Sequence, residues 1–302
     1  MRIPPYLKPG DTIGIVCPAG YMATERAGEC IETLQEWGFK VKTGKTLGSA
    51  STNYFSGTDE ERLTDLQEML DDDAVQAILF GRGGYGMSRI VDRIDFTKFR
   101  EKPKWIAGFS DITLLHLHIQ KNYSVSTLHA PMAGAFRDGE SGNEYVRSLR
   151  DCFLGMPVNY NVDGHPDNRP GIAEGKLIGG NLSLLINSLG TSSEPDTNGA
   201  ILFLEEVDEY LYSIDRMLMQ LLRAGKLSRL AGLIVGGFSG TKDTERPFGN
   251  TLNDLIKEKV EYFNYPVCFG FPVSHDRENY ALKCGVEYRL SVKLNEVRLF
   301  EQ

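Results

Sequence analysis

The sequence predicts an α/β protein whose first half is a parallel-sheet domain of the flavodoxin or Rossmann type and whose second half is an α+β domain. Two observations predict this division. Four apolar runs, each followed by a helical pattern, occupy residues 11–122, and strand-then-helix repetition is typical of a parallel sheet with helices on both faces. Residues 154–175 then become rich in Pro, Gly, Asn and Asp, and strand patterns dominate after them.

The elements of the first half follow in strict order. We expect strands at 11–20, 74–80 and 103–109, which are short and apolar, and a further strand at 39–45, where FKVKTGK follows a helical pattern closed by Gly38. Helical periodicity predicts helices at 24–38, 59–73, 87–94 and 110–122. This part corresponds to a domain over residues 1–155, followed by a linker over 156–171.

The second half, residues 172–302, alternates less regularly. Helices are expected at 181–190, 210–225 and 251–263, and strands at 200–206, 231–238, 267–274, 286–294 and 296–300. We expect these strands to form a mixed or barrel-like sheet.

Composition excludes several classes of function. The chain has 302 residues and a net charge of −8, without a basic run of five residues, so nucleic acid is not an expected partner. No apolar stretch approaches the ~20 residues that cross a bilayer, so we expect no membrane partner and a cytoplasmic location. The five cysteines show no C-x-x-C pair and are expected to be reduced and mostly buried.

A glycine loop follows the third predicted strand. Gly81, Gly83 and Gly86 match the spacing G-x-G-x-x-G of a dinucleotide fingerprint. That fingerprint normally follows the first strand and has an acidic residue at the end of the next one, where this chain has Ser110. A structural turn, a nucleotide site and a donor of backbone N–H groups to an oxyanion remain three readings of the loop.

Ser110 stands at the junction of the fourth predicted strand and its helix. The simplest role is a helix N-cap. The other is a nucleophile on a sharp strand-to-helix turn, although Ile112 replaces the second Gly of the G-x-S-x-G elbow.

A serine nucleophile needs a base and an acid that orients it. The five histidines are the candidates for the base, and of these His275 opens a polar loop after an apolar strand, a reasonable place for one. Glu205 and Glu206 both end the strand 200–206, and the residues alone do not choose between them. The five histidines are His116, His118, His129, His165 and His275.

Several motifs taken in order resemble the LD-carboxypeptidase family of serine peptidases, which includes murein tetrapeptide carboxypeptidases and microcin C self-immunity peptidases. The resemblance covers almost the full length and rests on LKPGDTIGIVCPAG, GRGGYG, GFSDITLLHL, LHAPM, GKLIGGNLSLLINSLGT, ILFLEEVDEYLYSIDRMLMQL, LAGLIVGGF and FPVSHDRENYALKCG. It implies that Ser110 is the nucleophile, Glu205 the orienting acid and His275 the base.

The resemblance also implies an activity. A cytoplasmic homodimer without metal or other cofactor would release a C-terminal D-amino acid from a murein tetrapeptide during cell-wall recycling. The oxyanion would accept N–H bonds from Asp111 and from the glycine loop, at Gly84 or Gly83, and Arg82 would hold a substrate carboxylate.

Two alternatives remain beside this activity. One is hydrolysis of a microcin C type peptidyl nucleotide, with Tyr85, Trp105 or Tyr280 as the platform for the base. The other is a non-catalytic nucleotide-binding module that uses the loop from Gly81 to Gly86.

The chain departs from the family pattern at two places. Ser274 precedes His275 where Gly is common, and Lys283-Cys284 precedes Gly285 where apolar residues with Pro are usual. Both departures concern the shape of the loop that carries His275.

Overall fold

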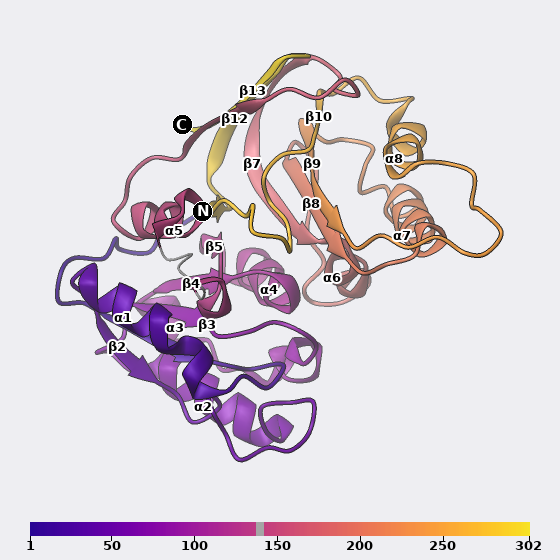
Figure 1. Cartoon of the computed structure of the whole chain (residues 1–302). Coiled ribbons are helices and arrows are strands. Elements are labelled where there is room, and N and C mark those ends of the chain that lie inside the picture. The colour runs from indigo at the N-terminus through magenta and orange to yellow at the C-terminus, as the bar shows by residue number, and fades with distance from the viewer. Residues whose placement is uncertain (137–141) are drawn as a thin grey trace. The chain divides into compact units, whose positions relative to one another are not determined.

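The computed structural model describes residues 1–136 and 142–302 and divides the chain into two compact units. Unit 1 contains Met1–Met156 and Tyr280–Lys283, and unit 2 contains Pro157–Asn279 and Cys284–Gln302. Figure 1 shows both, with unit 1 mostly in indigo and purple. The expected domain boundaries remain a prediction, to which the structure adds that a short C-terminal segment, 280–283, lies in unit 1.

The sheet of unit 1 has six strands in the order β11-β5-β4-β3-β1-β2. Strands β1 to β5 pair in parallel, and their order 2-1-3-4-5 is that of flavodoxin-like folds, so the predicted parallel α/β architecture is confirmed. Their bounds are β1 Thr12–Val16, β2 Lys40–Thr43, β3 Ala77–Phe80, β4 Trp105–Gly108 and β5 Thr127–His129, and β11 is Leu282–Cys284. The strands β3 and β4 are fully buried, as their continuous apolar sequences require.

Helices of unit 1 follow the strands as expected, with shorter bounds. Helix α2 begins at a capping box in which Thr58 and Glu61 bond each other's backbone N–H groups, and its apolar residues lie on one face. The helices are α1 Gly28–Glu36, α2 Asp59–Asp71, α3 Thr97–Glu101, α4 Thr113–Tyr123 and α5 Glu144–Phe153, and the 3-10 turns are η1 Thr24–Ala27, η4 Ser110–Ile112 and η5 Ala133–Phe136.

The prediction of a helix over 87–94 is wrong. Two 3-10 turns, η2 (Met87–Arg89) and η3 (Val91–Arg93), stand there instead. The first N–H group of η2, from Met87, binds the side chain of Asp111 rather than water or a preceding turn. The backbone leaves helical geometry at Ile90, which has φ of −125° and separates the two turns.

The sheet of unit 2 is mixed, as predicted, with seven strands in the order β10-β9-β8-β7-β12-β13-β6. Strands β7, β8, β9 and β10 pair in parallel, whereas β7, β12, β13 and β6 pair antiparallel. Within the described residues this sheet is open, with β10 and β6 as its edges, so the barrel-like version of the expectation is wrong. The bounds are β6 Asn159–Asp163, β7 Gly171–Asn181, β8 Ile201–Val207, β9 Gly232–Ser239, β10 Val267–Phe269, β12 Glu287–Val292 and β13 Glu296–Glu301.

Strand β6 lies inside the segment 156–171 that was expected to be a linker, because its alternating pattern lets it pair with β13. The helices of unit 2 are α6 Leu182–Ser188, α7 Leu211–Arg223 and α8 Leu252–Val260. In Figure 1 all three gather beside β8 and β9, away from the ribbon of β12 and β13. Strand β8 is buried along almost its whole length, including Glu205 and Glu206 near its carboxyl end.

Candidate active site

Gly81, Gly83 and Gly86 each lie so close to other protein atoms that a side chain would not fit. A β-carbon on Gly81 would lie 2.5 Å from Cys17 Sγ, and one on Gly86 would lie 2.6 Å from Arg62 Nη1 and 2.9 Å from Ala19 Cα. A β-carbon on Gly83 would lie 2.8 Å from the Cβ and 2.9 Å from the Oγ of Ser110. The open side of each glycine is therefore filled by the chain itself, and Gly83 lies directly against Ser110.

The loop is also fixed through its backbone. The N–H of Gly20 donates to the carbonyl of Gly83 at 3.0 Å, and the guanidinium of Arg82 donates to Tyr21 at 2.9 Å. Gly84 has φ of +105°, a conformation that favours glycine, and it is exposed. Backbone N–H groups of this loop thus lie at the carboxyl edge of the sheet beside Ser110.

Ser110 adopts a left-handed backbone with φ of +61°. It begins the 3-10 turn η4, whose N-cap is Phe109, while the N-cap of α4 is Ile112. Ser110 therefore occupies neither capping position, and the N-cap reading is wrong. A non-glycine residue in this conformation costs of the order of 1 to 2 kcal/mol, and such strain clusters at functional sites.

Asp111 follows Ser110 and is almost completely buried. Its Oδ2 accepts the N–H of Met87 at 2.8 Å. Burial raises the pKa of this carboxyl to about 6, against the opposing effects of the Met87 N–H and the charge of Arg62. The side chain of Asp111 thus joins the turn at Ser110 to the end of the glycine loop.

Unit 2 contains a carboxylate–imidazole pair. His275 Nδ1 lies 2.5 Å from Glu205 Oε2, with the carboxylate fully buried and the imidazole 15% exposed. Burial raises the pKa of Glu205, although the hydrogen bond from His275 lowers it. Burial lowers the pKa of His275, but the hydrogen bond and charge of Glu205 raise it by more, so the net shift is upward. The protonation of each member of the pair therefore depends on the other.

The neighbouring Glu206 has a different set of partners. Its carboxylate accepts hydrogen bonds from Asn181 Nδ2 at 2.7 Å and from the backbone and hydroxyl of Ser183 at 2.8 and 2.6 Å. The register of β8 against β9 shifts between Leu204 and Glu206, and the two acids have different hydrogen-bond partners. The acid that meets His275 is Glu205, whereas Glu206 fixes the first turn of α6.

The loop that carries His275 is braced by the residue that departs from the family pattern. Ser274 Oγ donates to the carbonyl of Glu278 at 2.9 Å and accepts the N–H of Asp276 at 3.0 Å. Ser274 is buried against Gly237, where a β-carbon would lie 2.5 Å from Ser274 Cβ. Ser274 therefore holds the loop with two local hydrogen bonds at the position where the resemblance leads us to expect glycine.

The second departure, Lys283-Cys284, is buried. Lys283 belongs to unit 1, and its ammonium donates to the carbonyl of Met156 at 3.0 Å and lies 4.9 Å from the centre of the Tyr6 ring. Cys284 is buried, and all five cysteines are buried without a disulfide, which confirms their expected state.

The surroundings of the other four histidines indicate structural roles. His116 is fully buried with Nε2 2.8 Å from the carbonyl of Gly108, and burial lowers its pKa to about 4. His118 and His129 are also buried, and His165 lies beside Asp167. Of the candidates for a base, His275 is the one that pairs with a buried carboxylate.

Trp105 is fully buried and stacks on Tyr6, so its suggested role as a nucleotide platform is wrong. Tyr85 is 48% exposed and packs against Phe55, and Tyr280 contacts Tyr145 and bonds Glu144.

Comparison with known proteins decides the family. The family model described as the LD-carboxypeptidase N-terminal domain matches residues 13–130, and that of the LD-carboxypeptidase C-terminal domain matches residues 174–290. The chain belongs to the LD-carboxypeptidase family. It is 37% identical to the probable murein peptide carboxypeptidase of Bacillus subtilis over 94% of this chain and 90% of that protein.

The chain is also similar to two further proteins along almost its whole length. The solved structure of the muramoyltetrapeptide carboxypeptidase of Oxalobacter formigenes has a TM-score of 0.87 and 27% identity, covering 96% of this chain and 99% of that one. The microcin C7 self-immunity protein of Escherichia coli is 25% identical over 97% of this chain and 94% of its own. Membership of this family makes the chain a hydrolase of the carboxypeptidase class.

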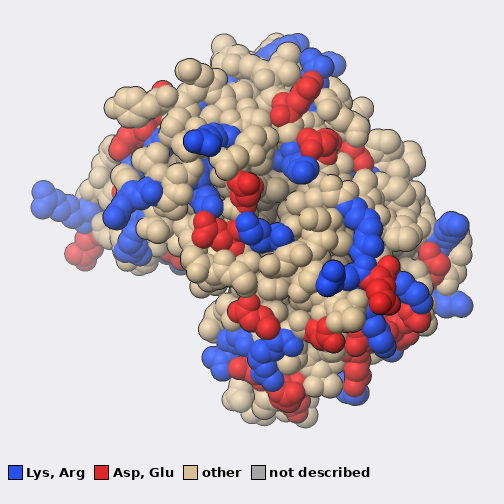
Figure 2. All heavy atoms as spheres, turned by 180° about the vertical axis from the view of Figure 1, so that it is seen from behind, with Lys and Arg blue, Asp and Glu red and all other residues tan. Residues whose placement is uncertain are grey.

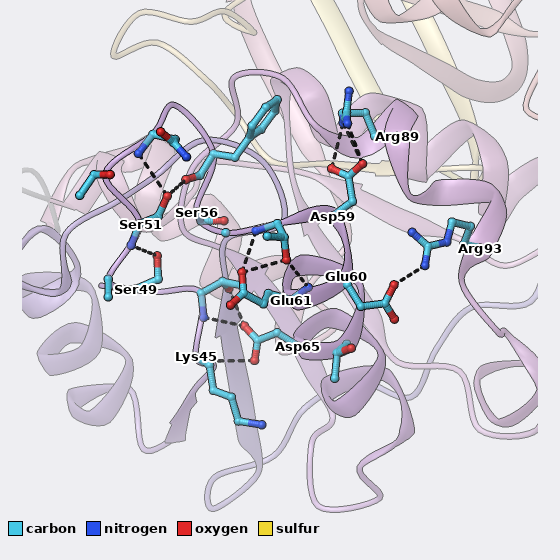
Figure 3. Close-up of a pocket in the computed structure, with 18 residues that line it drawn as sticks. Lys45, Ser49, Ser51, Ser56, Asp59, Glu60, Glu61, Asp65, Arg89 and Arg93 are labelled. Carbon is cyan, nitrogen blue, oxygen red and sulfur yellow. Dashed lines mark hydrogen bonds and ion pairs between the residues drawn. The ribbon is translucent and has the colours of Figure 1, made fainter.

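A pocket of unit 1 does not include Ser110 or the glycine loop. It has a volume of about 1020 Å³ and is lined by Arg89, Arg93 and residues between Lys45 and Asp65. Figure 3 shows that its charged groups pair with one another: Arg89 with Asp59 and Arg93 with Glu60. The described residues hold no cluster of three metal-ligating side chains. No helix in the described part of the chain is long and apolar enough to span a membrane.

Sequence reasoning missed Arg62 in unit 1 and Asn181 in unit 2. It also did not predict that Ser274 braces its loop. Arg62 lies in a charged helix, DEERLTDL, that reads as a solvent-exposed surface, and only the fold buries it. No local signal in the sequence marks it.

Proposed function

We propose that this protein is a serine-type LD-carboxypeptidase that releases C-terminal D-alanine from murein tetrapeptide. Ser110 is the nucleophile, His275 the base and Glu205 the acid that orients it. The observation that carries the proposal is the left-handed backbone of Ser110 with Gly83 against its side chain. Strain of this kind at a strand-to-helix turn is how hydrolases present a nucleophile.

The chemistry follows from the groups present. His275 removes the proton of Ser110 Oγ as the oxygen attacks the carbonyl of the amide between meso-diaminopimelate and D-alanine. The same imidazole then returns the proton to the departing amine, and water hydrolyses the acyl-enzyme. Glu205 accepts a hydrogen bond from the Nδ1–H group, fixes the tautomer and stabilises the imidazolium.

The oxyanion of the tetrahedral intermediate receives N–H groups from Asp111 and from the loop at Gly83 and Gly84. Each such donor is worth ~3 to 4 kcal/mol in the transition state. The contact between Gly83 and Ser110 supports this assignment. Arg82, which is exposed on the same loop, is the group we assign to a substrate carboxylate.

The site works without metal or cofactor in this proposal. The family resemblance further supports a cytoplasmic homodimer with a muropeptide as its small-molecule partner. On the face seen in Figure 2, Lys and Arg alternate with Asp and Glu, which disfavours nucleic acid as a partner on that face.

Hydrolysis of a peptidyl nucleotide is the second candidate. The similarity to a microcin C7 self-immunity protein and the exposure of Tyr85 beside the loop favour it. A nucleotide-binding module without catalysis is disfavoured, because Ser110 fills the open side of Gly83 where a pyrophosphate would approach.

The test uses purified protein with murein tetrapeptide and with a peptidyl nucleotide, each with and without EDTA. Ser110→Ala should lower D-alanine release by at least ~10⁴-fold. Ser124→Ala is the matched control, since Ser124 is a left-handed serine at the other end of α4 and should retain full activity. Activity that survives in Ser110→Ala, or that EDTA abolishes, contradicts the proposal.

A further inference from the structure

A buried guanidinium lies behind the glycine loop. Arg62 of α2 is fully buried and donates from Nη1 to the carbonyl of Pro18 and, at 3.2 Å, to the carbonyl of Gly86. Its Nε donates to Gly57 at 3.3 Å, and its Nη2 pairs with Asp59. One side chain thus joins the loop after β1, the loop before α2 and the end of the glycine loop.

A buried carboxylate holds the same end of the loop from the other side. Asp111 accepts the N–H of Met87, the residue after Gly86, and the charge of Arg62 acts on it. Its Oδ1 is buried and accepts no hydrogen bond from the described residues. Asp111 directly follows Ser110, so this single bond ties the nucleophile's turn to the loop.

These two groups are costly to bury. A guanidinium and a carboxylate in an apolar interior lose hydration that their contacts only partly restore, and apolar side chains of similar volume would often stabilise a fold as well. Arg62 and Asp111 are both buried against the end of the glycine loop, and that loop contacts Ser110 through Gly83.

We propose that Arg62 and Asp111 are positioning residues that hold the glycine loop at the separation from Ser110 at which its N–H groups reach the oxyanion. The inference rests on the proposed function and adds to it the device that sets the oxyanion geometry. Neither side chain touches the substrate. Both act through the backbone of residues 83–87.

The brace continues to the surface. Asp59 accepts hydrogen bonds from both Arg62 and Arg89, as the dashed lines from Arg89 in Figure 3 show in part. Arg62 therefore has a carboxylate partner at one end and backbone carbonyls at the other, which fixes its plane.

The experiment measures steady-state hydrolysis and the labelling of Ser110 by a fluorophosphonate in Arg62→Lys and Asp111→Asn. In labelling, an Oγ–P bond forms, the P–F bond breaks, fluoride leaves and the base takes the hydroxyl proton. Lysine keeps the charge but has one nitrogen, so it cannot reach all of these acceptors. We expect kcat and the labelling rate of Arg62→Lys to fall by about 10- to 100-fold with KM within about threefold.

Asp111→Asn retains an oxygen for the Met87 N–H and should lose less activity in the same pattern. The matched control is Arg169→Lys in unit 2, where the guanidinium also donates to two backbone carbonyls, those of Tyr265 and Val260 in the same unit. Its thermal stability should fall while kcat and labelling stay near wild type.

The outcomes separate the two proposals. If wild-type protein is not labelled at Ser110, as mass spectrometry would show, the proposed function fails. If wild type is labelled and both variants, folded by circular dichroism, match its kcat and labelling rate, the brace has no positioning role. A rise in KM with unchanged kcat also overturns the inference, because it indicates a loss of ground-state binding.

Discussion

His275 Nδ1 and Glu205 Oε2 lie 2.5 Å apart in a setting where the carboxylate has no exposure to solvent. The hydrogen bond fixes the tautomer in which Nδ1 carries the proton and Nε2 acts as the base. A charged partner at this distance also favours the imidazolium, and its effect exceeds that of burial.

The pH profile of kcat/KM should report this raised pKa. The base works when neutral, so kcat/KM rises with pH, and the midpoint should lie above the ordinary imidazole value of about 6.5. In Glu205→Gln the midpoint should move to lower pH, because the main raising contribution is lost while burial remains. Titration of the imidazole by NMR checks both values.

Glu206→Gln is the control for that experiment. Its carboxylate binds Asn181 and Ser183, so its removal should shift the midpoint less and lower thermal stability instead. Equal shifts in the two variants would contradict the assignment of Glu205.

Gly83→Ala should disturb the nucleophile directly. A β-carbon there would lie 2.8 Å from Ser110 Cβ, closer than any normal contact, so either the loop or Ser110 must move. We expect kcat to fall by about 10²-fold, the typical effect of a displacement near 1 Å. Gly28→Ala, where a β-carbon meets nothing within 4 Å, should leave kcat and the melting temperature nearly unchanged.

Ser274→Ala tests the brace of the His275 loop. Loss of the hydroxyl removes two part-buried hydrogen bonds, to the Asp276 N–H and the Glu278 carbonyl, which should cost about 1 kcal/mol of unfolding free energy. We also expect a lower kcat, since the loop carries the base. Ser228→Ala removes an exposed hydroxyl that bonds Gly225 and should change stability by less than about 0.5 kcal/mol. Chemical denaturation of both variants decides the matter.

Ser110→Gly should separate stability from activity. Glycine adopts φ of +61° without strain, so this variant should unfold with a free energy equal to or up to about 1 kcal/mol above wild type while hydrolysis is lost. Ser124→Gly should show the same change in stability with full activity. A destabilised Ser110→Gly beside a stabilised Ser124→Gly would mean that strain is not stored at the nucleophile.

Local patterns were sufficient for most of the first sheet. Strands such as 77–80 and 105–108 are continuous apolar runs that can only be buried, and the periodic segments between them form the expected helices. The prediction of a helix over 87–94 failed because the backbone leaves helical geometry at Ile90, a buried residue, and the apolar pattern does not show this break.

The sequence by itself determined the order of most elements and the family, because these depend on neighbouring residues and motif order. Family resemblance implied Glu205 as the acid, and the tertiary structure supplied the physical contact, since it is Glu205 and not Glu206 that lies against His275. Tertiary structure alone decided that Tyr280–Lys283 joins unit 1 and that the charged Arg62 is buried. Burial and partner choice arise from residues far apart in the chain, and a pattern of neighbours carries no record of them.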